Sequence, residues 1–86
     1  MRESLWALMP GQRKRLLVRK ATDIVDQHLA HLIRVRHSGR FQFYRWSAEI
    51  DRFINSQVMV TLGDDERRTL PRYQNELKLF IAVRVA

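Results

Sequence analysis

The chain has 86 residues, of which 45% are hydrophobic and 29% charged, with no cysteine and a formal net charge of +7. This length predicts a single basic domain over 1–86 with a small core, and the lack of cysteine excludes disulfides and cysteine-ligated zinc. No apolar run approaches the roughly 20 residues of a membrane span, and the N-terminus is not typical of a secretory signal. We therefore expect a cytoplasmic protein without membrane contact.

The net positive charge lies entirely in the first half of the chain. Residues 1–45 hold ten Lys/Arg and three Asp/Glu, whereas residues 46–86 hold six of each. Thirteen of the sixteen basic residues are Arg, whose guanidinium can bind a phosphate through two parallel hydrogen bonds. Charge confined to one part of a small domain favours a polyanionic partner such as nucleic acid.

Residues 1–11 are expected to form a short segment before the first long helix, because Pro10 and Gly11 favour a turn. From Gln12 to about Arg36, apolar residues recur at helical spacing. The sequence predicts one continuous helix over 12–36, with an apolar flank and a cationic flank. A break in this helix, or arginines scattered around all of its sides, would remove the case for a polyanion-binding surface.

Two further helices follow in the sequence. The apolar residues of 41–62 share one helical face, and Gly63 is expected to end that helix. Thr69 with Pro71 predicts the start of a last helix towards the C-terminus. The predicted fold is therefore an all-α domain of three principal helices, the first of them long and amphipathic.

A competing interpretation is an α+β fold. Residues 33–36 and 41–44 flank 37–40 like the arms of a hairpin, and apolar residues alternate over 77–85 as in a strand. The stretch 33–44 also resembles the central hairpin of small basic ribonuclease toxins of the RelE/ParE kind, and this resemblance implies RNA cleavage. We prefer helices because the helical pattern after residue 12 is long.

The candidate nucleic-acid-binding residues form two clusters, one over 13–20 and one over 34–45. Phosphates along a backbone require several cations on one surface, and aromatic rings between arginines can stack on unpaired bases. These candidates are Arg13, Lys14, Arg15, Arg19, Lys20, Arg34, Arg36, Arg40, Tyr44 and Arg45.

The apolar stripe over 12–36 is wider than two short helices are expected to cover. It forms either the core of the domain or an interface with a second copy or a partner's helix. The apolar run over 79–83 is a second candidate for burial at an interface. The expected homodimer or partner interface contains Leu17, Ile24, Val25, His28, Leu32 and Phe80.

The sequence contains no recognisable catalytic motif or phosphate-binding loop, so we expect neither an enzyme nor a cofactor. His28 and His31 could form half of a metal site, but no third ligand is indicated and we predict no metal. The predicted function is a small DNA-binding regulator or accessory factor of bacterial, plasmid or phage origin, with DNA preferred to RNA. The alternative is an adaptor, chaperone or inhibitor that binds an acidic protein through the same face.

Overall fold

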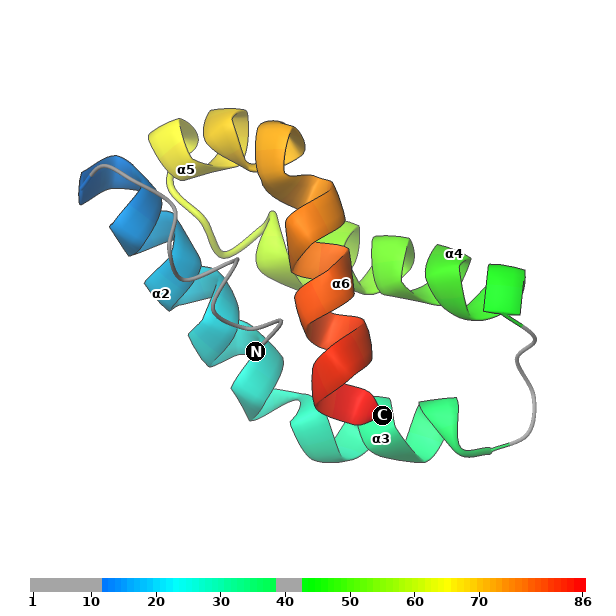
Figure 1. Cartoon of the computed structure of the whole chain (residues 1–86). Coiled ribbons are helices and arrows are strands. Elements are labelled where there is room, and N and C mark those ends of the chain that lie inside the picture. Colours follow the sequence, from blue (N-terminus) through cyan, green and yellow to red (C-terminus); the bar gives the residue numbers. More distant parts are fainter. Residues whose placement is uncertain (1–11, 39–42) are drawn as a thin grey trace.

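The structure is a computed structural model that describes residues 12–38 and 43–86, without the side chains of 12–14 and 43–44. Every regular element in these ranges is a helix, which confirms the all-α prediction (Figure 1). No helix in this part of the chain combines the length and apolar character of a membrane span. The elements are α2 (Gln12–Gln27), α3 (Leu29–Arg36), α4 (Phe43–Phe53), the π-helix η1 (Ile54–Val58), α5 (Asp64–Thr69), the 3₁₀-helix η2 (Leu70–Tyr73) and α6 (Gln74–Val85).

The prediction of one continuous helix over 12–36 is wrong, because the chain turns at His28, between α2 and α3 (Figure 1). The backbone N–H of His28 is shared between the carbonyl oxygens of Ile24 (3.2 Å) and Val25 (3.1 Å). The Nδ1 atom of the His28 side chain lies 2.9 Å from the same Ile24 oxygen. The imidazole also meets Phe53 edge-to-face, with ring centroids 5.4 Å apart. A side chain that competes for a helix carbonyl bends the helix without Pro or Gly.

The second predicted helix is present as α4, which continues directly into η1. In η1 the hydrogen-bond pattern widens, and the N–H of Met59 donates to the carbonyl of Ile54 at 2.8 Å, five residues earlier. Ile54 and Val58 are both buried, while the three residues between them are exposed. The wide turn therefore directs two apolar side chains into the core at the end of the helix.

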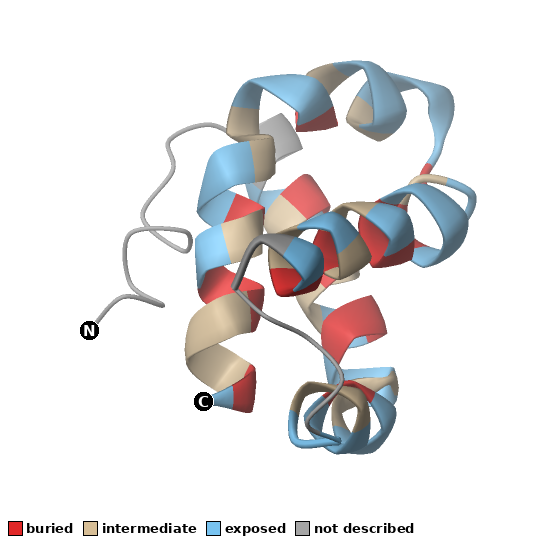
Figure 2. Ribbon diagram, turned by 90° about the vertical axis from the view of Figure 1, so that its right-hand side faces the viewer, coloured by how far each residue is buried: buried red, intermediate tan, exposed pale blue. Residues whose placement is uncertain are grey.

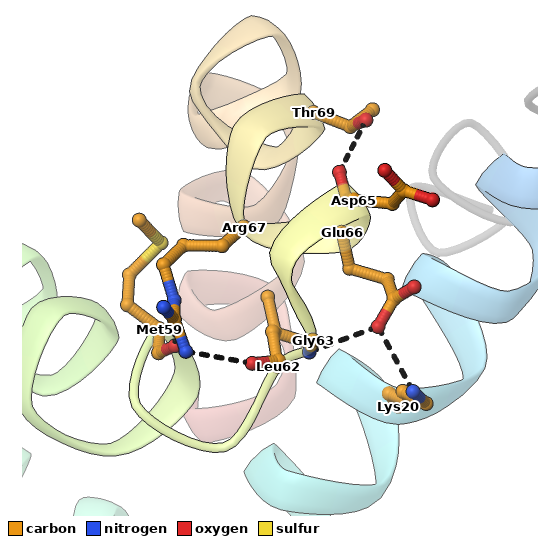
Figure 3. Close-up of polar contacts among 8 residues, drawn as sticks. All are labelled: Lys20, Met59, Leu62, Gly63, Asp65, Glu66, Arg67 and Thr69. Atoms are coloured by element: carbon orange, nitrogen blue, oxygen red, sulfur yellow. Dashed lines mark hydrogen bonds and ion pairs between the residues drawn. The ribbon is translucent and has the colours of Figure 1, made fainter.

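Arg67 closes the loop that follows η1. Its guanidinium donates to the carbonyls of Met59 at 3.0 Å and Leu62 at 2.8 Å (Figure 3). Gly63 is the N-cap of α5, and its N–H donates to Glu66 Oε1 at 3.0 Å, which is half of a capping box. These bonds satisfy backbone groups that lie outside the helices and would otherwise need water.

The last predicted helix begins at Leu70 as η2 and continues as α6. Pro71 fits the first turn of η2, where its missing N–H costs no hydrogen bond. The buried side chains of α6 recur every three or four residues, and they are Leu77, Phe80, Ile81 and Val85.

The α+β alternative is wrong for every described residue that it involved. Residues 33–36 belong to α3, residues 43–44 begin α4 and residues 77–85 belong to α6. The described parts of both arms are thus helical, and the likeness to a toxin hairpin loses its structural basis. Residues 39–40 of the expected tip and residues 41–42 of the second arm lie outside the described residues.

The helices enclose one core, with α6 packed against α3 and α4, and α2 packed against α5 and η1 (Figure 1). Figure 2 colours the ribbon red at the buried residues of these helices. Every buried residue in the described ranges is apolar. The core consists of Leu17, Ala21, Ile24, Val25, Leu32, Trp46, Ile50, Phe53, Ile54, Val58, Leu62, Leu70, Leu77, Phe80, Ile81 and Val85.

Candidate nucleic-acid interface

The outer face of α2 carries two of the predicted phosphate-binding residues. Arg15 and Arg19 are exposed, and neither forms an ion pair with another described residue. Four residues span about 6 Å along a helix axis, so the two guanidinium groups project from neighbouring turns. The exposed carboxylate of Asp23 follows one turn later on the same side. The cationic part of this face is therefore limited to the first turns of α2.

Lys20 differs from Arg15 and Arg19, because its ammonium group already donates to Glu66 Oε1 at 2.9 Å within the protein (Figure 3). The bond from Lys20 lowers the pKa of the Glu66 carboxyl below its ordinary value, and the Gly63 N–H adds to this shift. Lys20 thus joins α2 to the N-terminus of α5. The prediction that it binds phosphate requires this internal bond to open first.

The second cluster lies on α3 and the start of α4. Arg34 is exposed and forms no ion pair within the described ranges, and Arg45 is also exposed. Arg36 is half-buried, with its guanidinium carbon 5.6 Å from the centroid of the Trp46 ring. That contact holds Arg36 against the fold, so Arg34 and Arg45 are the more accessible cations of the cluster.

Four of the predicted site residues cannot be placed. Arg13 and Lys14 lie in α2 and Tyr44 lies in α4, but their side chains are outside the described part of the structure. Arg40 lies in the range 39–42, which is also outside it.

The two clusters do not share one straight flank, because the turn at His28 separates them. α2 and α3 run in different directions, so the cations of 13–20 and those of 34–45 are carried by two helix axes (Figure 1). The sequence therefore identified both clusters of basic residues, but it did not predict that they lie on helices with different axes.

The basic residues of the second half are compensated by neighbouring carboxylates. Most of these pairs are local, such as Arg52 with Glu49 at 3.3 Å and Arg68 with Asp65 at 3.0 Å. The remaining pairs are Arg67 with Asp64, Lys78 with Asp51, and Arg84 with Asp26 of α2. Arg72 is the one basic residue after 46 for which no such partner is found among the described residues.

The expected dimer or partner interface is located mostly inside the single chain. Leu17 and Val25 have no exposed surface, and Ile24, Leu32 and Phe80 are also buried. Only His28 is partly accessible. The five apolar residues belong to the core, which was the simpler interpretation of the apolar stripe, and they offer no outer surface to a second copy.

His28 and His31 do not belong to a metal-binding cluster. Within 12–38 and 43–86, no three His, Cys, Asp or Glu side chains are grouped so that they could hold an ion. His28 instead directs Nδ1 to a backbone carbonyl of its own helix.

Comparisons of this chain with protein-family models, with curated proteins and with solved structures find no match.

Proposed function

We propose that the chain binds nucleic acid through α2 and α3, as a small DNA-binding regulator or accessory factor. The observation that carries this proposal is the uneven compensation of charge. Arg15, Arg19 and Arg34 are exposed without a carboxylate partner in the described ranges, whereas most cations of α4–α6 are paired. A cation already bonded to a carboxylate gains less from a phosphate, because it must first release its partner.

The turn at His28 removes the straight cationic flank on which the prediction from sequence depended, so the proposal now rests on the exposed arginines of α2 and α3 that form no ion pair among the described residues. Phosphate groups surround a duplex on two backbones, so patches on two helix axes can contact different strands or turns. Each phosphate that is neutralised releases counterions and adds to the affinity. DNA is preferred to RNA because small basic regulators more often bind DNA.

A pair of double variants with equal total charge tests this proposal. The first is Arg15→Gln with Arg19→Gln, and the matched control is Arg52→Gln with Arg68→Gln. The affinity for a random-sequence DNA duplex is measured by fluorescence anisotropy across a salt series. We expect the wild type to lose affinity steeply with salt, and the α2 variant to reduce the slope of log K against log salt by about 2.

The control variant should stay close to the wild-type slope. Equal losses in the two variants would mean that only the net charge matters, which contradicts a defined surface. No binding of the wild type at low salt would sink the proposal altogether. Incubation with RNA tests the ribonuclease alternative, which predicts cleavage that the α2 variant loses.

A further inference from the structure

A groove runs between α4 and α6, away from the α2 arginines that carry the proposed function. It has a volume of about 290 Å³, and its walls include Trp46, Ile50, Leu79 and Ala82. A second hollow of about 420 Å³ lies beside it at the end of α3, and the two share Trp46 and Ala82 as lining residues. The chain therefore presents a long, mainly apolar depression along one side of α6.

The helix α6 is more apolar than a surface helix requires. Its inner side is buried in the core, but Leu79 on the groove side is 46% exposed, and Ala82 is only partly covered. A helix that is apolar on nearly all sides is normally covered by another element. In the described ranges, no element covers the groove side of α6.

The charges around the groove indicate what kind of partner can cover it. Lys78 lines the groove and Arg36 lines the adjoining hollow, whereas no acidic side chain lines either one. Lys78 shares its charge with Asp51, to which it donates at 3.1 Å, and Arg36 lies against Trp46. Arg36 forms no ion pair among the described residues, whereas Lys78 is already paired with Asp51, so the positive charge of the rim comes mainly from Arg36.

A second copy of the chain fits this surface poorly. A two-fold dimer would place each groove against itself, so the same cations would face one another. The net charge of +7 per chain adds to this repulsion. Bare nucleic acid fits poorly too, because the floor is apolar and offers little to phosphates.

We infer that the groove binds an acidic amphipathic helix of another protein. Apolar side chains at positions i and i+4 of that helix would enter beside Trp46 and Leu79. Carboxylates on its flanks would then lie near Lys78 and Arg36. The groove lies apart from the α2 arginines and shares only Arg36 with the predicted nucleic-acid-binding residues, so the inference can be tested without nucleic acid.

A display library of 18-residue helical peptides tests the inference, with the full chain as bait. The library keeps one stripe of varied apolar residues and varies the charge of the flanks from basic to acidic. We expect the enriched peptides to be net negative, with micromolar affinity in titrations. Leu79→Asn should lower the affinity for these peptides at least tenfold. Ala82→Glu should lower it similarly, because it places a bulky negative charge in the groove.

Val60→Asn is the matched control, because Val60 is 65% exposed and does not line the groove. It should change the affinity by less than twofold. Circular dichroism and thermal unfolding establish whether each variant is folded. Leu79→Asn and Ala82→Glu change the groove in different ways, so the test still works if only one of them folds.

Three results would overturn the inference. An absence of enrichment, or enrichment of neutral and basic peptides, would exclude an acidic helix as the occupant. Equal binding to Leu79→Asn would mean that charge alone attracts the peptides, at another place. A dimer in sedimentation that Leu79→Asn dissociates would assign the groove to a second copy instead.

Discussion

Arg68 and Arg19 are both exposed arginines on the surface of a helix, yet they differ in their surroundings. Arg68 donates to Asp65 at 3.0 Å, whereas Arg19 forms no ion pair with any described residue. The same contrast separates α4–α6 from α2 and α3 more generally. In the second half, every described basic residue except Arg72 has a carboxylate partner, whereas Arg15, Arg19 and Arg34 in the first half have none among the described residues.

The first half is attached to the rest of the protein mainly by apolar contacts. The inner face of α2 is buried at helical spacing from Leu17 to Val25, and its outer face is polar apart from Leu16. Lys20 with Glu66, and Asp26 with Arg84, are the described ion pairs between α2 and later elements. The comparison indicates that α2 is stabilised mainly by its apolar face, while Arg15 and Arg19 stay exposed without an ion pair among the described residues.

The largest expected effect comes from Leu17→Ala, compared with Leu16→Ala. Leu17 is fully buried and Leu16 is 45% exposed, although the two are adjacent. Leu17→Ala should lower the free energy of unfolding by about 3 kcal/mol, because it leaves a cavity in the core. Leu16→Ala should change it by less than about 0.5 kcal/mol. Urea unfolding followed by circular dichroism measures both.

The same experiment separates a core from a dimer interface. If Leu17 stabilised a dimer, the unfolding midpoint of the wild type would rise with protein concentration. We expect a midpoint independent of concentration. Equal losses from the two substitutions would contradict the assignment of faces on α2.

A smaller effect is expected at Lys20 and Glu66, where the two halves of the chain meet. The bond from Lys20 lowers the pKa of Glu66 below its ordinary value of 4.5, so the ionised carboxylate favours the folded state. This stabilisation is complete above the ordinary pKa and is lost as the pH falls through the lower pKa of the folded state. The urea midpoint of the wild type should therefore decrease on acidification from pH 7 towards pH 3.

Glu66→Gln supplies the reference for this pH dependence, because other carboxylates titrate in the same range. Between pH 7 and pH 3, the urea midpoint of the variant should decrease by less than that of the wild type. Identical losses would show that the contact between α2 and α5 contributes nothing through charge.

The smallest effect should distinguish a paired arginine from an unpaired one. Arg68→Ala removes an exposed i,i+3 ion pair and should cost about 0.3 kcal/mol at low salt. Arg19→Ala, in α2, removes no described ion pair, so it should lower the free energy of unfolding by less than Arg68→Ala does. Thermal unfolding at low and high salt tests the difference, which salt should abolish for Arg68. A salt-sensitive loss at Arg19 would contradict the contrast between the two halves.

The sequence predicted the helices where a local pattern determines them. Apolar spacing identified the segments of α2, α3, α4 and α6, and Gly63 marked the boundary before α5. Apolar alternation over 77–85 suggested a strand, but this region is also apolar at helical spacing, and the helix buries Leu77, Phe80, Ile81 and Val85. Composition alone could not decide between these patterns.

The features that the sequence could not predict depend on residues far apart in the chain. Lys20 lies 46 residues from Glu66, so no local pattern identifies their ion pair. The turn at His28 involves a contact with Phe53 and lacks the Pro or Gly that usually marks a bend. The groove is lined by residues of both α4 and α6, so it could be recognised only once the two helices were placed side by side. For the candidate site, the sequence therefore located the basic residues and missed which of them are already bound.

The turn at His28 has a consequence for the way the chain acquires its shape during synthesis. A straight helix over 12–36 would measure about 37 Å, close to the longest dimension of the molecule, 39 Å. Because the chain bends instead, α3 rests against α6, and His37 Nε2 lies 3.3 Å from the carbonyl oxygen of Val85. The packing of α3 is thus complete only after the residues of α6 have been synthesised, and loss of the final turn of α6 would remove the contact between His37 and Val85.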